Sequence, residues 1–328
     1  MIKVGLTLAL AFSLILVGFS TQEAYAVADC VGAEKPMLLS NEIYLNSVTT
    51  LFKYDTSDNT QCTIGAIGEA CTDISIHPTT GVLYCITGFG ELFTIDRTSG
   101  SAGAAIGDLD DPDLAPGTPL TSLNSFDFKP NGQAHVTGTD CRFFELDYTT
   151  PKLIKKFLMT SSDHPGPAPD CIGASGDLVY DIVAGDEWYM SSLNCEGAAP
   201  GLGDSCLPNN GMYKVRFGPG DAVFISSLGF NTVHGADFVG STTIITWATE
   251  DEELFRTTTG GTPTGTNDGS TGIEVFGGSA VPILLGGTAI LIDKTSLLLG
   301  AVQLNVGWIS LVVFAGLGLV IYKISRKK

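Results

Sequence analysis

The chain has 328 residues and carries 35 acidic against 17 basic side chains, which gives a formal net charge of −18. A surface this acidic repels nucleic-acid phosphates and anionic lipid headgroups, so it excludes electrostatic nucleic-acid binding and favours cations or cationic partners. Solubility in salt is the simpler explanation of the same charge. The two ends of the chain differ from this acidic middle because both are apolar.

The first segment, residues 1–26, has the layout of a signal peptide. Lys3 supplies a positive charge, an apolar run covers residues 4–19, and Ala-Tyr-Ala at 24–26 forms a small-x-small cleavage site. We therefore expect export of the chain and a mature protein that begins at Val27. A retained N-terminal anchor is the alternative.

The opposite end predicts one transmembrane helix over residues 306–322. This segment contains no charged side chain and is followed by the basic tail 323–328. As a helix it extends about 26 Å, close to the roughly 30 Å of a bilayer's hydrocarbon core. Trp308 and Tyr322 lie near its ends, where aromatic rings favour the interface, and the basic tail marks the cytoplasmic side. A buried core helix is the alternative.

Eight cysteines lie between the two apolar ends. An even number of cysteines in an exported chain predicts up to four disulfides. Cys195 and Cys206 enclose a loop rich in glycine and proline, and we predict that they pair, whereas the partners of the other six stay open. No C-x-x-C motif is present, and the histidines do not lie at ligand spacing from cysteines, which argues against redox, zinc-ribbon and haem sites.

Two sequence elements recur along the middle of the chain. The first is an aspartate in a short apolar strand, at Asp73, Asp127, Asp181 and Asp237, with spacings of 54, 54 and 56 residues. The second is an apolar-aromatic strand, which occurs five times, at residues 51–55, 92–96, 144–147, 212–215 and 254–257. Apolar and polar residues alternate in these strands, and turns such as Pro-Thr-Thr-Gly separate them, a pattern typical of β-hairpins.

This period predicts an all-β fold, a β-propeller of about five four-stranded blades over residues 27–280. Each unit is too small to bury its own faces, so neighbouring units must cover them. The first apolar-aromatic strand has no aspartate strand before it. We therefore expect the last strands, near residues 273–276, to complete a blade with the N-terminal segment. An array of two-sheet sandwiches is the alternative.

The four repeated aspartates are the candidate site. If they lie on the innermost strands, Asp73, Asp127, Asp181 and Asp237 face the channel, where a ring of carboxylates can hold a hard cation such as Ca²⁺. The alternative is structural, with each carboxylate accepting backbone N–H bonds that join neighbouring blades. The acidic loop 108–113 lacks the glycine and distal glutamate of an EF-hand, so we interpret it as solvated, and we interpret the run 250–253 as a charged hairpin tip.

No nucleophile-elbow, zinc-protease or phosphate-loop motif is present, and nothing in the sequence specifies an organic cofactor. Three functions stay open: a non-catalytic binding module for an envelope protein, glycan or small solute; a metal-dependent hydrolase or lyase at the channel mouth; and a structural component of the envelope. A polar pocket where aspartates converge with His77 or His234 would indicate the enzyme. A dry apolar patch would indicate an interaction surface.

Two resemblances add expectations to these readings. The unit Asp-Ile-x-x-x-Pro-x-x-Gly-x-Leu-Tyr, followed by Leu-Phe-x-Ile-Asp-x-x-x-Gly, resembles repeats of secreted β-propellers of the quinoprotein-like and NHL-like kind, best over residues 51–107. That resemblance implies the fold and does not choose an activity. The stem at 281–305, with a short apolar helix, and the span after it are similar to the C-terminal anchor of exported surface proteins of ammonia-oxidising archaea. This similarity implies an archaeal cell envelope, with the main domain outside.

Overall fold

The computed structural model describes residues 28–30, 40–111, 120, 123–161, 171–192, 210–230, 232–264 and 269–280. All of them belong to one of the two units into which the chain divides, Met1–Pro282. The predicted signal peptide, stem, transmembrane helix and tail lie outside the described residues, as do Cys195 and Cys206. Within the ranges given above, no helix is long and apolar enough to cross a membrane.

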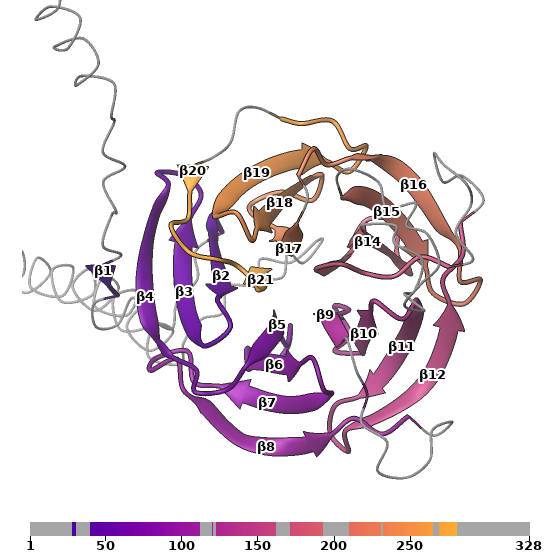
Figure 1. Ribbon diagram of the computed structural model, residues 1–328, viewed down its shortest axis with the longest axis horizontal. Helices are drawn as coiled ribbons and strands as arrows, with labels where there is room; N and C mark the ends of the chain where they lie inside the picture. Colours follow the sequence, from indigo (N-terminus) through magenta and orange to yellow (C-terminus); the bar gives the residue numbers. More distant parts are fainter. Residues whose placement is uncertain are drawn as a thin grey trace, which may run out of the picture. The chain divides into compact units, whose positions relative to one another are not determined.

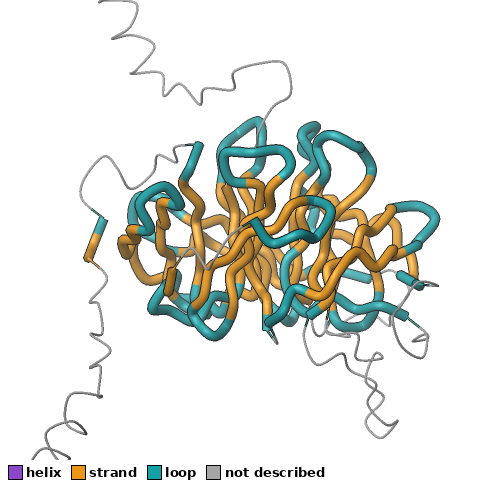
Figure 2. Tube along the Cα trace, turned by 90° about the horizontal axis from the view of Figure 1, so that it is seen from above, coloured by secondary structure: helices purple, strands orange, loops and turns teal. Residues whose placement is uncertain are grey.

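Five sheets follow one another around a central axis, and each forms one blade of a propeller (Figure 1). In side view the strands run between two layers of loops (Figure 2). Blade 1 contains β5 (Cys71–Ile76), β6 (Leu83–Thr87), β7 (Glu91–Ile95) and β8 (Ala102–Asp108). Blade 2 contains β9 (Leu123–Phe128), β10 (Ala134–Gly138), β11 (Arg142–Asp147) and β12 (Lys152–Leu158). Blade 3 contains β13 (Leu178–Tyr180), β14 (Glu187–Ser192), β15 (Gly211–Arg216) and β16 (Ala222–Ser227). Blade 4 contains β17 (Val233–Phe238), β18 (Ile244–Thr249), β19 (Glu253–Thr258) and β20 (Gly269–Ser270).

Blade 5 closes the ring by combining the two ends of the propeller sequence. Its inner strand β21 (Gly277–Ala280) pairs with β2 (Glu42–Asn46), which is followed by β3 (Thr50–Asp55) and β4 (Thr60–Ala66). The short β1 (Ala28–Asp29) lies parallel to β4 at the outer edge. The predicted propeller of five four-stranded blades is therefore confirmed and the sandwich alternative is wrong. The closing strand begins one residue after the predicted segment 273–276.

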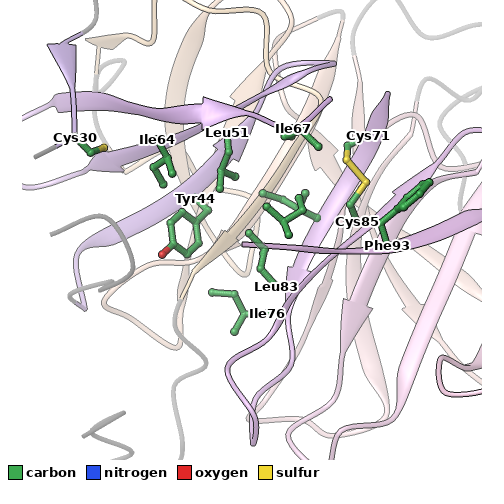
Figure 3. Packing of buried hydrophobic residues seen from close by; sticks show 12 residues of the cluster. Cys30, Tyr44, Leu51, Ile64, Ile67, Cys71, Ile76, Leu83, Cys85 and Phe93 are labelled. Carbon is green, nitrogen blue, oxygen red and sulfur yellow. A yellow bond between two sulfur atoms is a disulfide. The ribbon is translucent and has the colours of Figure 1, made fainter. Parts of the chain in front are cut away.

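The apolar-aromatic repeat is explained by burial on both faces of each blade. Consecutive strand residues point to opposite faces of a sheet, and in a propeller both faces are covered by neighbouring blades. Leu51 and Phe52 on β3 are accordingly both buried, as are Leu92 and Phe93 on β7. Figure 3 shows one of these interfaces, in which Tyr44 and Leu51 of blade 5 pack in the same cluster as Leu83 of blade 1.

Each inner strand of the first three blades ends in a turn whose conformation requires a particular residue. The turns that begin at His77, Lys129 and Asp181 each contain a glycine with positive φ, at Gly81, Gly132 and Gly185. Only glycine adopts that backbone region without steric cost. These turns fix where each inner strand stops, and they therefore fix the register of the residues that face the channel.

Three disulfides join the six described cysteines. Cys71–Cys85 links β5 to β6, Cys30–Cys62 links the residue after β1 to β4, and Cys141–Cys171 links the residue before β11 to the segment before β13. Figure 3 shows the Cys71–Cys85 bond beside the apolar cluster between blades 5 and 1. The predicted disulfide framework is thus present, although the one pair proposed from sequence lies outside the described residues.

Removing the Cys71–Cys85 bond is expected to destabilise the propeller. The bond closes a loop with a sequence separation of 14, and a loop of that size is worth about 3 kcal/mol in the chain-entropy account. In urea unfolding, the Cys71→Ala/Cys85→Ala double variant should have an unfolding free energy about 3 kcal/mol below that of the wild type, and therefore a lower midpoint. An unchanged midpoint would contradict the expectation that this bond stabilises blade 1.

Candidate functional site

Four buried or partly buried aspartates surround the propeller axis, one from each of blades 1 to 4. They are Asp73 on β5, Asp127 on β9, Asp177 immediately before β13 and Asp237 on β17. Asp73 and Asp177 are fully buried, whereas Asp127 and Asp237 keep slight exposure. The inner strands of neighbouring blades lie next to one another around the axis, so each carboxylate reaches the following blade. We call these four residues the channel aspartates.

Each channel aspartate makes the same pair of hydrogen bonds. One oxygen accepts the backbone N–H of its own following residue, at 2.6–2.7 Å. The other oxygen accepts a backbone N–H from the inner strand of the next blade, and these donors are Phe126, Tyr180, Ala236 and Ala280, at 2.6–2.8 Å. The fifth blade junction uses a hydroxyl instead, since Ile76 N–H donates to Ser279 Oγ at 3.0 Å. A side-chain acceptor therefore links every pair of adjacent blades.

These bonds confirm the blade-joining interpretation for three of the four predicted residues. Asp181 was predicted to be the fourth, but the structure places it after β13, at the start of a turn. There it accepts N–H bonds from Val183 and Ala184, and its other oxygen accepts the Tyr189 hydroxyl and lies 3.4 Å from Lys214 Nζ. Asp177, four residues earlier, occupies the channel position that Asp181 was expected to fill.

The predicted aspartates are evenly spaced in sequence, but they do not occupy equivalent positions on their strands. The channel aspartates lie at two levels along the axis. Asp73 and Asp177 come four residues before the turn that ends their strand, whereas Asp127 comes two residues before its turn. Asp237 lies on the level of Asp127, because both accept the N–H of the last residue of the next inner strand. Alignment on the turns at His77, Lys129 and Asp181 would have identified Asp177 from sequence.

The carboxyl groups of the channel aspartates are largely shielded from solvent. Burial raises the pKa of Asp127 to about 6, and it raises the pKa of Asp73, Asp177 and Asp237 well above the usual range. Asp73 and Asp177, which come from blades 1 and 3, each influence the pKa of the other's carboxyl group. Two like charges that influence each other disfavour double ionisation, which adds to the effect of burial in keeping these pKa values high.

The other sequence candidates do not converge on one end of the channel. His77 follows the last residue of β5, and its Nε2 lies 2.8 Å from the Tyr148 hydroxyl. His234 lies near the start of β17, with Nε2 3.6 Å from Glu250 Oε2. Because the inner strands run parallel, the two histidines lie at opposite ends of the channel. Among the described residues, no group of three or more His, Cys, Asp or Glu side chains has the geometry of a metal site.

The two acidic runs differ from each other. Glu250 and Asp251 lie between β18 and β19, which confirms the predicted charged hairpin tip. Asp111, in the run 108–113, is buried rather than solvated, and its carboxylate accepts a hydrogen bond from Arg142 Nη1 at 2.7 Å. An arginine partner stabilises a buried carboxylate, so the expectation of a solvated loop is wrong at Asp111.

The outer strand β12 carries a feature that sequence reasoning missed. It is the edge strand of blade 2, and its side chains Ile154 and Leu158 are 51% and 56% exposed. Ile154 is the extra residue of a bulge against β11. Lys152, Lys155 and Lys156 make the same strand basic in an acidic chain. The sequence Lys-Leu-Ile-Lys-Lys-Phe-Leu could have indicated this exposure, because its apolar residues fall on both faces of a strand.

Comparisons with known proteins show likeness in structure only. No protein-family model matches the sequence, and no curated protein matches it. Among solved structures, a nidogen/laminin complex is 8% identical, with a TM-score of 0.45 over 74% of this chain and 81% of that chain. The Dos1 propeller is 13% identical, with a TM-score of 0.35 over 69% of this chain and 56% of that chain. Such values carry no argument about function, and the propeller fold rests on the strand pairing described above.

Proposed function

We propose that this protein is a membrane-anchored, extracellular propeller that serves as a binding module of the cell envelope. The observation that carries the binding function is the edge strand β12. An edge strand offers unpaired backbone groups to another chain, and natural proteins limit such pairing with lysines and bulges, both of which β12 has. What this edge adds is the exposure of two large apolar side chains, Ile154 and Leu158, beside those lysines.

The occupant that fits β12 is an extended segment of another envelope protein, with alternating acidic and apolar side chains. Its backbone would add to the sheet of blade 2, its acidic groups would face the lysines, and its apolar groups would cover Ile154 and Leu158. The propeller already accepts such an addition within its own chain, because β1 lies parallel on the outer strand β4 of blade 5. In the described part of the chain, one bridge joins Asp110 of blade 1 to Lys152 at the start of β12, and another joins Thr160, two residues beyond its end, to Asp221 of blade 3.

A binding experiment with synthetic peptides tests this role. We expect a labelled peptide of alternating valine and glutamate to bind the full chain in detergent, measured by fluorescence anisotropy. An Ile154→Lys/Leu158→Lys variant should bind at least tenfold more weakly, which corresponds to about 1.4 kcal/mol. Val183→Lys, which alters another exposed apolar residue on blade 3, is the matched control. Equal binding by both variants, or equal binding of a valine-lysine peptide, would contradict the proposal.

The extracellular placement is supported by the disulfides. Three disulfides in one domain are typical of chains that fold in oxidising compartments. The signal peptide at 1–26 and the apolar segment 306–322 support export followed by anchoring. Protease added to intact cells should digest the propeller and leave a small membrane-bound C-terminal fragment. A full-length, protease-protected chain that starts at Met1 would contradict this placement.

A further inference from the structure

Two Asn-Gly pairs occur in the sequence, Asn131-Gly132 and Asn210-Gly211, and the structure places them in opposite surroundings. An asparagine followed by glycine is prone to lose its side-chain amide. The backbone nitrogen of the glycine attacks Cγ of the asparagine, ammonia leaves, and water opens the resulting succinimide ring to aspartate or isoaspartate. Glycine favours this reaction because it has no side chain to hinder the attack. Only water is consumed, so the local structure decides which pair reacts.

Asn131 lies in the turn between β9 and β10. This turn runs from Lys129 to Gly132, whose N–H donates to the Lys129 carbonyl at 2.8 Å. Asn131 is exposed, and its Oδ1 accepts the N–H of Gln133 at 3.0 Å, which holds the carboxamide beside the backbone that attacks it. Surface turns open locally at little cost in free energy, so the Gly132 nitrogen becomes available while the propeller stays folded.

Asn210, by contrast, is held in the interior of blade 3. It has no exposed surface, and its Nδ2 donates to Ser175 Oγ at 2.6 Å. Its backbone N–H donates to the Phe230 carbonyl at 2.6 Å. Gly211 begins β15, which pairs with β14 on one side and with β16 on the other. Water reaches this pair only when the strands separate, and opening of that kind approaches the cost of global unfolding.

A change at Asn131 reaches the interface between blades 1 and 2, because Gly132 lies against His77 of blade 1. A β-carbon placed on Gly132 would lie 2.8 Å from His77 Nε2, the same atom that lies 2.8 Å from the Tyr148 hydroxyl. The His77 ring also packs on Phe128 of blade 2, with centroids 4.9 Å apart. Isoaspartate inserts one additional carbon into the backbone before Gly132. The glycine must then move, and His77 leaves it little room.

We infer that Asn131 is a site of spontaneous deamidation, whose products are an aspartate or isoaspartate form of the turn. The modification adds one negative charge at the end of the propeller where the inner strands stop. The isoaspartate form also weakens the contact between blades 1 and 2 through Gly132 and His77. Asn210 keeps its amide for as long as blade 3 is folded.

The test follows both asparagines in one sample. The full chain is kept in neutral buffer, and samples taken over time are digested and analysed by mass spectrometry, which separates the amide from the acid. In the folded protein Asn131 should convert on the order of tenfold faster than Asn210, or more. In denaturant the two should convert at similar rates, because both then lie in unfolded chain. Asn210 is thus the matched control for Asn131.

A second measurement tests the effect on the blades. Anion exchange should separate a more acidic form that accumulates with time, and its isoaspartate fraction should melt a few degrees below the unmodified protein. Asn131→Gln should accumulate neither the charge nor the loss, because glutamine closes the larger ring far more slowly. Equal conversion of Asn131 and Asn210 in the folded protein, or an intact Asn131 after the unfolded chain has reacted, rejects the site. Equal melting temperatures of the two forms reject its effect on the interface.

Discussion

Replacing Asp237 with alanine should destabilise the protein by about 2–5 kcal/mol, because two backbone N–H groups lose their acceptor. Asp237 accepts the N–H of Phe238 and that of Ala280 on β21, each at 2.6 Å. A buried donor left unsatisfied costs about 1–3 kcal/mol. Ala280 belongs to the four-residue strand that closes the ring, so the loss falls on the junction between blades 4 and 5. Urea unfolding followed by circular dichroism or fluorescence measures this change.

The matched control for this variant is Asp251→Ala in the same blade. Asp251 lies exposed at the hairpin tip between β18 and β19, and exposed substitutions usually change stability by less than 0.5 kcal/mol. The Asp237→Ala protein should also be cut by protease more rapidly near β21 than the control. If the two variants unfold at the same urea concentration, the channel aspartates do not join the blades.

Replacing His135 with phenylalanine should stabilise the protein in acid. His135 lies on β10 with its ring centroid 4.5 Å from that of Trp188 and 4.7 Å from that of Phe217. Neither ring nitrogen has a hydrogen-bond partner in the part of the chain that the structure describes. Burial, with a contribution from the charge of Lys129, lowers the pKa of His135 to about 3. Phenylalanine keeps the aromatic packing and removes the ionisable group.

The direction of the pH effect on stability follows from the difference in the His135 pKa between the folded and unfolded chains. The unfolded chain protonates His135 near its ordinary pKa of about 6.5, while the folded protein does not until about 3. The unfolded state therefore binds more protons between these values, and wild-type stability falls as the pH drops below 6.5. At pH 4.5 the penalty is about 2–3 kcal/mol. Groups shared by both proteins cancel in the comparison.

The measurement is urea unfolding of wild type and His135→Phe at pH 7.5 and pH 4.5. The difference in unfolding free energy between the two proteins should grow by about 2–3 kcal/mol in favour of the variant at the lower pH. A difference that stays constant between the two pH values would show that His135 ionises in the folded protein as readily as in the unfolded chain.

The fold could be predicted from sequence because the repeat arises from local and general physics. Residues such as Leu51 and Phe52 must both be apolar when each blade is covered on two faces, and the glycine turns recur where hairpins reverse. The pairing of the last strand with β2 followed from an unmatched first copy. These signals depend on strand periodicity and burial, which the sequence displays directly.

The site was predicted less completely because register within a strand is set by contacts between distant residues. Asp177 and Asp181 are both plausible from spacing, and only the turn that starts at Asp181 decides between them. Asn46 carries no motif, and its burial follows from the pairing of β2 with β21, which sets it opposite Gly277 across more than 200 residues of chain. The exposure of Ile154 and Leu158 likewise depends on β12 being last in its sheet.

Amide hydrogen exchange at the five blade junctions tests most directly whether channel side chains join the blades. The informative N–H groups are those of Ile76, Phe126, Tyr180, Ala236 and Ala280. In the wild type these amides should exchange only through global unfolding. In Asp237→Ala the Ala280 amide should exchange faster than the other four. Exchange of these five groups as rapid as that of exposed turn amides would contradict the account.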